Sequence, residues 1–320
     1  MKLKHAIMFG LLGEQRDRLT TYRGPHSLAE RLEMVRGIAG VDGIEVGFPG
    51  EFRDMAAGLA AIKASGFAVS AINQNTKADP KWREGSFTCT NPAIRKEAVA
   101  EMKTAMDIAA ELGCYMVHCC PLIDGHNYNF QADYLKMWDW LVEGLTEAAH
   151  YRKDVRLTLE FKPYEARNFC IVSDTGTTLL LSSLIGPNVG LTWDIGHALI
   201  AGEAPAQSIA MAGKFGRLFY LHFNDNMRDW DWDMLPGSVN VWDLVECFYY
   251  LDKLGWEGWA SYDVLARSGD DAVLGQAATL KIVQLAQQFL AKLGVAKLDE
   301  LVAAGHPHDA IPYLWETMVK

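Results

Sequence analysis

Eight short apolar or alternating segments recur along the chain, separated by stretches in which apolar residues return every three or four positions. The short segments span 5–10, 43–48, 68–73, 115–120, 156–161, 189–194, 218–223 and 259–264. Runs of this length bounded by turn residues predict buried strands, and the longer spacing predicts amphipathic helices. Among the intervening stretches, we expect helices at 27–39, 51–65, 91–112, 134–151 and 241–254.

Continuous alternation of strand and helix favours one architecture. Because crossovers between parallel strands are right-handed, eight such units close most naturally into an α/β fold of the (β/α)8 TIM barrel type. Gly66, Gly113 and Gly255 each end a predicted helix directly before the next strand, which is typical of left-handed C-caps. A doubly wound open sheet is the alternative.

No break in composition divides the chain into two large domains. We expect residues 1–293 to form the catalytic barrel, with a long last helix at about 271–293, and residues 294–320 to form a C-terminal helical tail. Such a tail packs on its own barrel or on a neighbouring subunit, so we expect a homo-oligomer. His306 and His308 form an HxH pair, which we interpret as part of an exposed tail loop rather than as a metal site.

The charge balance limits the classes of partner. The chain has 30 Lys and Arg against 40 Asp and Glu, so its net charge is −10 at pH 7. An acidic chain without a basic stripe is not expected to bind nucleic acid or an anionic membrane. Gly10, Gly13 and Glu14 interrupt the first apolar run, which fits neither a signal peptide nor a membrane span. We therefore expect a cytoplasmic protein.

The sequence lacks the motifs of several common classes of enzyme and binding site. The six cysteines have no CxxC spacing, so we expect buried thiols rather than a zinc knuckle or a disulfide framework. There is no G-x-S-x-G, P-loop or H-E-x-x-H motif, which argues against a serine hydrolase, an NTPase and a zincin. A glycine-rich phosphate loop is also missing, so a free sugar fits better than a phosphosugar, and no organic cofactor is expected.

Four ligand-type side chains end four successive predicted strands. They are Glu160, Asp194, His222 and Asp263, in the runs RLTLEF, VGLTWD, LFYLHF and WASYDV. In a barrel, the carboxyl ends of all strands open onto one mouth, where catalytic residues lie. A buried carboxylate there costs several kcal/mol unless it is paired or bound to a metal. The four residues therefore predict a divalent metal site.

Other polar residues follow these four closely. Lys162 lies two positions after Glu160 on the same side of the strand, where it could orient a ligand or pair with Glu160. His197 lies three positions after Asp194 and can reach the same mouth. The next loop contains four aspartates, which suit a second metal, a sugar-binding set or a solvated acidic loop. These are Asp225, Asp229, Asp231 and Asp233.

Further candidates come from the other predicted strand ends and from the acidic loop. His118, Glu45 and Asn73 end earlier strands and would bind hydroxyls or relay protons, unless they are hydrogen-bonded core groups. Arg228 in the acidic loop is a candidate substrate residue. Three tryptophans near the candidate ligands would stack on a sugar ring or fill the core. They are Trp193, Trp230 and Trp232.

The motifs of the second half carry a family resemblance. E-x-K-P-x-E begins at Glu160, D-x-G-H begins at Asp194, and H-x-N-D begins at His222 and is followed by two paired aspartates and a strand-end Asp. This pattern resembles the xylose isomerase-like barrel superfamily, and within it L-rhamnose isomerase-type sugar isomerases. The resemblance covers the last four strands closely and the first 110 residues only in architecture.

The resemblance implies roles for these residues. The four strand-end residues would hold one Mn²⁺-type ion, with Co²⁺ or Mg²⁺ as alternatives. Glu160 would bridge to a second ion shared with His197, Asp231 and Asp233, although this acidic pair lies about one residue further from His222 than in the family pattern. The expected catalytic residues are Glu160, Lys162, His197, His118 and Asp263.

The implied activity is a metal-dependent aldose–ketose isomerisation of a free sugar. A ketose 3-epimerase is one alternative, but such enzymes place a Glu where this chain has Asp263, whose shorter side chain reaches less far as a base. The catalytic subunit of a C-glycoside deglycosidase, which cleaves a 3-oxo-glycoside and works with a small accessory subunit, is a second alternative. A barrel that senses a sugar without catalysis is the third.

Overall fold

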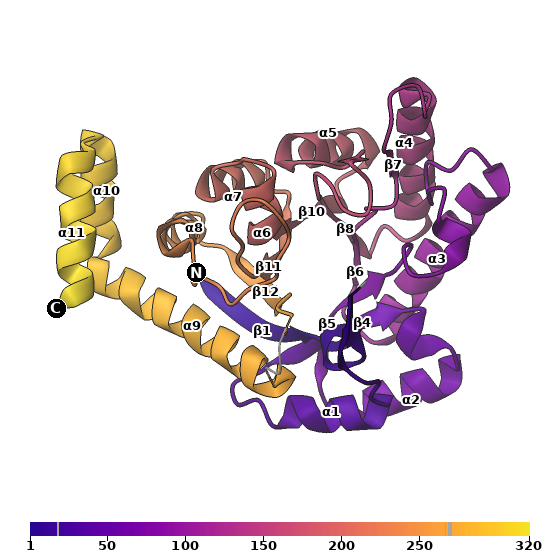
Figure 1. Ribbon diagram of the computed structural model, residues 1–320, viewed down its shortest axis with the longest axis horizontal. Coiled ribbons are helices and arrows are strands. Elements are labelled where there is room, and N and C mark those ends of the chain that lie inside the picture. The colour runs from indigo at the N-terminus through magenta and orange to yellow at the C-terminus, as the bar shows by residue number, and fades with distance from the viewer. Residues whose placement is uncertain (18, 266, 268–270) are drawn as a thin grey trace.

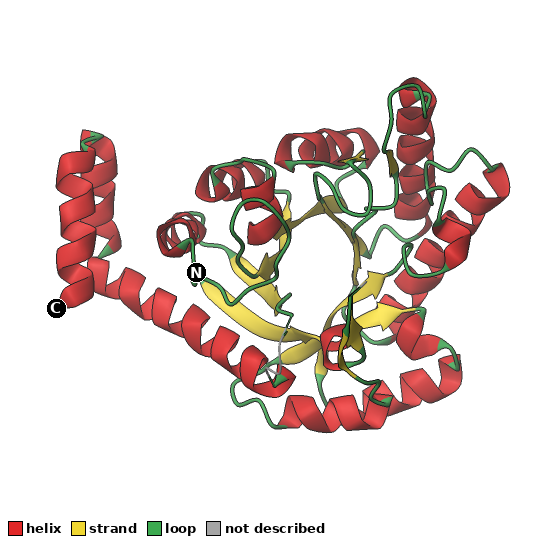
Figure 2. Cartoon of the chain, in the orientation of Figure 1, coloured by secondary structure: helices red, strands yellow, loops and turns green. Residues whose placement is uncertain are grey.

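A computed structural model describes residues 1–17, 19–265, 267 and 271–320. Eight parallel strands form a closed barrel at the centre of the molecule, and helices surround it (Figures 1 and 2). The barrel strands are β1 (Lys2–Met8), β4 (Gly43–Phe48), β5 (Ala68–Gln74), β6 (Met116–Cys119), β8 (Arg156–Glu160), β10 (Val189–Asp194), β11 (Leu218–Phe223) and β12 (Glu257–Tyr262).

Neighbouring barrel strands are also neighbours in the chain. Their order is β1-β12-β11-β10-β8-β6-β5-β4, and every pairing in this barrel is parallel. All carboxyl ends therefore open onto one mouth. The predicted (β/α)8 barrel is confirmed, all eight predicted strands are present, and the open-sheet alternative is wrong.

The outer helices follow the barrel strands in turn. They are α1 (Leu28–Arg36), α2 (Met55–Ser65), α3 (Pro92–Glu111), α4 (Tyr134–Tyr151), α5 (Thr175–Ile185), α6 (Ile195–Ile200), α7 (Pro205–Lys214), α8 (Val241–Lys253) and α9 (Ala272–Leu293). Ser27 and Glu30 form a capping box on α1, and Asp54 caps α2 in a similar way. Gly66, Gly113 and Gly255 have φ of +77°, +74° and +57°, which confirms the predicted left-handed turns into the next strand.

Short elements decorate the loops between the barrel strands and helices. Two antiparallel hairpins pair β2 (Gln15–Arg16) with β3 (Thr21–Arg23) and β7 (Gly125–His126) with β9 (Phe169–Cys170). Three 3-10 turns follow strand ends or precede helices: η1 (Phe9–Leu12), η2 (Gly50–Phe52) and η3 (Pro80–Trp82). Residues of β2, β3 and η1 contribute to the wall of the cavity described below.

The last helices extend away from the barrel. α9 crosses beside β1, and α10 (Val295–Ala304) and α11 (Pro307–Val319) stand together at its far end (Figure 1). Leu298 and Leu314 pack towards the main core, whereas Ile311 and Trp315 are exposed on α11. None of the described helices is long and apolar enough to cross a membrane.

Two smaller predictions from the sequence have different outcomes. All six cysteines lie among the described residues as free thiols, and five are buried, as predicted. His306 and His308 are exposed, but the loop interpretation is wrong for His308. His306 is the N-cap residue of α11, and His308 lies within this helix.

Candidate metal centre

Four neighbouring strands bring the main candidate ligands to one point of the mouth. Glu160 and Asp194 are the last residues of β8 and β10, His222 is the penultimate residue of β11, and Asp263 directly follows β12. Asp194 and His222 are register partners across the β10–β11 pair. One donor atom from each of the four residues lies within 4.8 Å of the others. We call these four residues the strand-end cluster.

The imidazole of His222 stands between carboxylates of the strand-end cluster. Its Nδ1 is 2.8 Å from Glu160 Oε1 and 3.9 Å from Asp194 Oδ2. Asp194 is itself fixed, because its Oδ1 accepts the backbone N–H of His197 at the start of α6 and its Oδ2 accepts the Asn224 amide, both at 2.9 Å. The cluster is therefore held by the backbone and by a neighbouring amide.

The strand-end cluster contains three carboxyl groups and only one imidazole. The pKa of Asp263 is raised to about 7, chiefly by burial, with the carboxylates of Asp194 and Glu160 adding to the rise and His222 opposing it. Burial also raises the pKa of Asp194. For Glu160, burial acts in the same direction, but the imidazoles of His222, His118 and His197 outweigh it and hold its pKa well below the usual range.

These residues fit a divalent cation. Carboxylate oxygens and an imidazole nitrogen are the ligands that Mn²⁺ and related ions take in proteins. Buried Asn224 Oδ1, Asp231 Oδ1 and Asp233 Oδ1 have no hydrogen-bond partner among the described residues. Buried polar atoms are normally paired, and a positive charge would offset the excess of carboxylates here.

Glu45 lines the cavity and also contacts His222, so its predicted role as a substrate residue stays a prediction. Its Oε2 is 3.0 Å from His222 Nε2 and accepts the Tyr220 hydroxyl at 2.8 Å, and its Oε1 accepts the Asn73 amide at 2.7 Å. Burial raises the pKa of Glu45, but His222, His118 and the Tyr220 hydroxyl outweigh burial and lower it to about 2. The carboxylate is therefore ionised and fully engaged.

His118 also lies behind the cluster rather than in the wall of the cavity. Its Nε2 is 3.3 Å from Glu160 Oε2, and its Nδ1 is 2.9 Å from Thr192 Oγ1. The residue is 1% exposed. The structure thus places His118 where it orients Glu160, and its predicted catalytic role would act through that carboxylate.

Lys162 does not pair with Glu160, which its position in the sequence indicated as a possible partner, but with two other carboxylates. Its Nζ lies 2.6 Å from Asp231 Oδ2 and 2.5 Å from Glu165 Oε2, and it makes no ion pair with Glu160. Burial opposes its charge, but Asp231 and Glu165 outweigh burial and raise the pKa of Lys162 well above its usual value. The ammonium is permanent and held at the cavity wall.

The residues of the predicted second metal site lie on the same wall without converging. His197 Nε2 is 3.1 Å from Asp231 Oδ2, which also accepts Lys162, and His197 Nδ1 is 3.6 Å from Glu160 Oε1. Among the described residues, His197, Asp231 and Asp233 form no group of donor atoms as compact as the strand-end cluster. Despite its burial, Asp194 and Asp231 raise the pKa of His197 to about 9. The second ion stays a prediction.

The first aspartate of the acidic loop has a structural role. Asp225 is 1% exposed, and its carboxylate accepts the backbone N–H groups of Val239 and Asn240 and the side-chain amide of Asn240, at 2.8, 3.0 and 2.6 Å. Asp229 accepts the indole N–H of Trp232. Amide donors therefore surround the charge of Asp225, which needs no cation to balance it.

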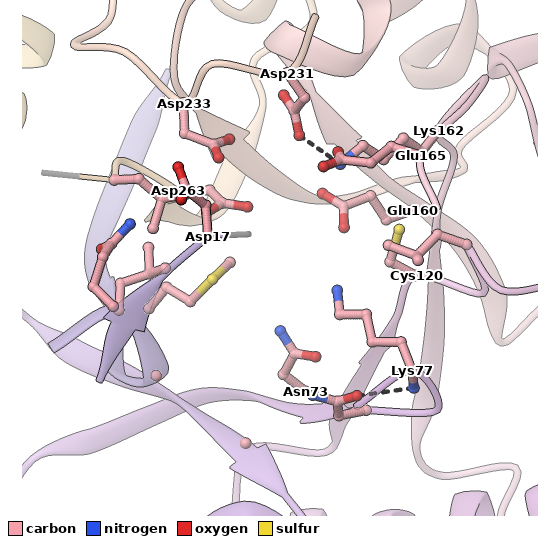
Figure 3. A pocket seen from close by; sticks show the side chains of 18 of the residues that line it. Asp17, Asn73, Lys77, Cys120, Glu160, Lys162, Glu165, Asp231, Asp233 and Asp263 are labelled. Carbon is pink, nitrogen blue, oxygen red and sulfur yellow. Dashed lines mark hydrogen bonds and ion pairs between the residues drawn. The ribbon is translucent and has the colours of Figure 1, made fainter. Parts of the chain in front are cut away.

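A cavity of about 1280 Å³ opens above the strand-end cluster. Figure 3 shows Glu160, Asp231, Asp233 and Asp263 on one side of it, and Asn73 and Lys77 on the other. The Lys77 ammonium points into the cavity and makes no ion pair with any described residue. No pattern in the sequence marks Lys77, because it lies in the polar loop after β5 and not at a strand end.

One predicted substrate residue and one of the three tryptophans lie away from the cavity. The Arg228 guanidinium contacts Asp243 at 2.8 Å and Asn240 at 3.0 Å, at the start of α8, so its assignment to the substrate is corrected. Trp193 is fully buried, and its indole N–H donates to Ser208 Oγ, so it fills the core. Trp230 and Trp232 do line the cavity and are 42% and 41% exposed.

Known proteins share this sequence pattern and fold. The sequence profile described as xylose isomerase-like TIM barrel matches residues 38–293. A xylose isomerase from Thermus thermophilus is 30% identical over 268 residues, which cover 80% of this chain and 68% of that protein. A xylose isomerase from Thermus caldophilus is 29% identical over 218 residues, which cover 66% of this chain and 56% of that protein.

Solved structures of sugar epimerases have the same barrel. L-ribulose 3-epimerase superposes with a TM-score of 0.71 at 19% identity, covering 95% of this chain and 99% of that one. 3-Keto-D-glucoside 4-epimerase from E. coli superposes with a TM-score of 0.66 at 17% identity, covering 89% of this chain and all of that one. At such identities, the likeness shows the fold alone.

Proposed function

Because this chain belongs to the xylose isomerase-like TIM barrel family, we propose that it is a sugar isomerase, and that it interconverts the aldose and ketose forms of a free sugar with a divalent metal ion. The observation that carries this proposal is the convergence of the strand-end cluster at the floor of the cavity. Mn²⁺ is the preferred ion, and Co²⁺ or Mg²⁺ would suit the same ligands.

Glu160, Asp194, His222 and Asp263 would hold the ion. When bound, it would supply Lewis-acid polarisation of two neighbouring sugar oxygens, which makes the hydrogen on the adjacent carbon easier to move. His222 presents Nδ1 to this point because Glu45 engages its Nε2. His118, which is itself hydrogen-bonded to Thr192, orients Glu160 from behind.

The cavity wall supplies the groups that position the sugar. The Lys162 ammonium, held between Asp231 and Glu165, would donate to a sugar oxygen as negative charge develops there. Buried His197 Nδ1 has no hydrogen-bond partner among the described residues and could donate to a second oxygen. Lys77 on the opposite wall would bind an oxygen at the far end of the sugar.

Glu160 is the group best placed to handle a proton. Its carboxylate stays ionised because His222, His118 and His197 surround it, and its Oε1 lies at the base of the cavity. It would take a proton from one sugar carbon and return it to the next, with an enediol between the two steps, unless the hydrogen moves directly as hydride. Removal of this carboxylate should abolish turnover in the first case.

Ketose 3-epimerisation is the second candidate function. The observation that favours it is the match of the whole barrel to L-ribulose 3-epimerase. The observation against it is Asp263, which directly follows β12 and reaches less far towards a C3 proton than a Glu would. Asp263 suits a ligand better than a base.

Cleavage of a 3-oxo-glycoside is the third candidate. A cavity of about 1280 Å³ exceeds the upper end of the range of about 300–1,000 Å³ that is usual for small-molecule sites, so it leaves room for a substituent on the sugar. Trp230 and Trp232 line the outer part of this cavity and could stack on such a substituent. A small accessory subunit would be expected to copurify in this case.

One experiment separates the three candidates. The metal-loaded protein is incubated in D₂O with a panel of aldoses, ketoses and 3-oxo-glycosides, and NMR follows products and deuterium. Ketose formed from aldose supports isomerisation, and deuterium at C2 then indicates the enediol route rather than a hydride shift. Deuterium at C3 of a ketose supports epimerisation, release of the substituent supports cleavage, and no turnover on any substrate contradicts the proposal.

The oligomeric state and the cellular location of the protein are also proposals. We propose a cytoplasmic homo-oligomer, and exposed Ile311 and Trp315 on α11 are consistent with a subunit contact. Light scattering on the purified chain would measure its mass directly. A mass equal to one chain at micromolar concentration would contradict the oligomer.

A further inference from the structure

Glu45 occupies a position that the proposed chemistry does not use. It is the third residue of β4, and its side chain is fully buried against β11 and β5. Three donors reach it: Tyr220 and His222 approach Oε2, and Asn73 donates to Oε1. A sugar hydroxyl would compete with these protein donors, so Glu45 is poorly placed to bind the substrate as its main task.

The contact with His222 has a consequence for the ring nitrogens. If Nε2 carries the proton and donates it to Glu45 at 3.0 Å, Nδ1 is left with its lone pair facing Glu160 and Asp194. An imidazole can bind a cation only through a nitrogen without a proton. Glu45 thus selects the tautomer in which the free nitrogen points into the strand-end cluster.

Glu45 is itself held on the side away from the cluster. Tyr220 and His222 are two positions apart on β11, so their side chains lie on the same face of the strand, and both reach Glu45. The Tyr220 hydroxyl also lies 2.8 Å from Ser70 Oγ on β5. A chain of contacts from Ser70 through Tyr220 and Glu45 therefore fixes the orientation of the His222 ring.

We infer that Glu45 is a positioning residue for the metal site and sets the tautomer and orientation of His222. Carboxylates that orient ligating histidines in this way typically change metal affinity by about 10–100-fold when they are removed. The inference rests on the proposed metal site, and it assigns Glu45 a role that its place in the sequence does not reveal.

Glu45, His118 and His222 could also be taken for a separate metal site, because donor atoms of these three residues lie within 4.8 Å of one another. Their hydrogen bonds argue against it. Both oxygens of Glu45 accept protein donors, and His118 uses its two nitrogens towards Thr192 and Glu160. Unpartnered buried oxygens occur instead on the cavity side, at Asp231 and Asp233. The cation therefore belongs on the Nδ1 side of His222.

The test compares Glu45→Leu and Glu45→Gln in the full chain, with Mn²⁺ as the probe. Isothermal titration of the EDTA-stripped proteins measures the Mn²⁺ dissociation constant without any need for turnover. We expect Glu45→Leu to weaken binding about 10–100-fold. Glu45→Gln keeps an oxygen that can accept the His222 Nε2 proton, so it should recover most of the affinity. Glu203→Gln, which changes a half-buried carboxylate bound to Thr175 at the start of α5, is the control and should bind as the wild type does.

A second readout keeps the inference testable if Glu45→Leu folds poorly. ¹⁵N NMR of histidine-labelled, metal-free Glu45→Gln and wild-type protein reports the tautomer of His222, with His222→Asn used to assign its signals. Protonated Nε2 in both proteins is expected. An Nε2 without a proton in the wild type, or an unchanged Mn²⁺ dissociation constant in a folded Glu45→Leu variant, would overturn the inference. Absence of Mn²⁺ binding by the wild type would instead refute the proposed function.

Discussion

Asp225 and the strand-end cluster hold buried negative charge in opposite ways. Asp225 is surrounded by N–H donors from Val239 and Asn240, which stabilise its charge and fix the loop. In the strand-end cluster, carboxylates face one another across His222, and the pKa of Asp263 rises to about 7. The difference teaches that a buried acid marks a ligand site only where the protein's own donors leave its charge unbalanced.

The largest expected effect separates Glu160 from Asp225. Glu160→Gln should reduce turnover about 10³-fold, because the carboxylate both binds the cation and handles the proton. Asp225→Asn should leave metal affinity unchanged but lower the free energy of unfolding by about 1–3 kcal/mol, because buried N–H groups lose a charged acceptor. Steady-state kinetics and urea denaturation measure the two quantities. The comparison breaks if Asp225→Asn loses the metal and Glu160→Gln keeps it.

The second-largest expected effect concerns the Lys162 ammonium at the cavity wall. Lys162→Met should reduce kcat by about 10²-fold, because one preorganised donor at the developing charge is lost. The Mn²⁺ dissociation constant should change little, since Lys162 contacts Asp231 and Glu165 rather than the strand-end cluster. Kinetics and titration of the same sample provide both values. A large loss of metal affinity with unchanged kcat would show that Lys162 supports the ion instead.

The pKa of Asp263 predicts how the metal-free protein responds to pH. Its pKa is raised in the folded state to about 7 from 3.8, so between these values the folded state binds more protons than the unfolded state. The stability of the EDTA-treated wild type should therefore fall as the pH rises from about 4 to about 7. Asp263→Asn should remove most of this slope and be the more stable protein at pH 8.

Thermal melting in EDTA across this pH range measures the effect. Asp225→Asn is the matched control, because no comparable excess of carboxylates surrounds it, and it should keep the wild-type slope. If stability falls with pH equally in the wild type and in Asp263→Asn, the titration of Asp263 does not cause the pH dependence.

The smallest effect concerns the wall opposite the cluster. Lys77→Met should raise KM about tenfold with a smaller change in kcat, because one charged hydrogen bond to the far end of the sugar is lost. Arg228→Ala removes a cation of the same charge that pairs with Asp243 outside the cavity, and it should leave KM unchanged. If both substitutions raised KM equally, the cause would be the change in the net charge of the protein and not the loss of a contact between Lys77 and the sugar.

The fold could be predicted from the sequence because each barrel strand is a short local signal. Runs such as VGLTWD and LFYLHF are apolar up to the ligand residue, and glycines such as Gly66 end the helices between them. Parallel pairing then places every strand end at one mouth, so Glu160, Asp194, His222 and Asp263 follow from position alone. Their placement in the structure agrees with this reasoning.

The contacts within the site could not be predicted, because they depend on side-chain directions between distant segments. Glu45 has the same signal as Glu160 in the sequence, yet it lies under His222, 177 positions away in the chain. Arg228 has a φ of +65° and turns towards Asp243, and Trp193 faces Ser208 in the core. Lys77 lies in a loop that has no regular period.

Titration of Mn²⁺ into the EDTA-stripped wild type and His222→Ala tests the central claim most directly. The account predicts a tight site in the wild type that His222→Ala loses, with both proteins folded by circular dichroism. A stoichiometry of two would in addition support the second site at His197, Asp231 and Asp233. A wild type that binds no Mn²⁺, or a His222→Ala variant that binds it equally well, would contradict the account.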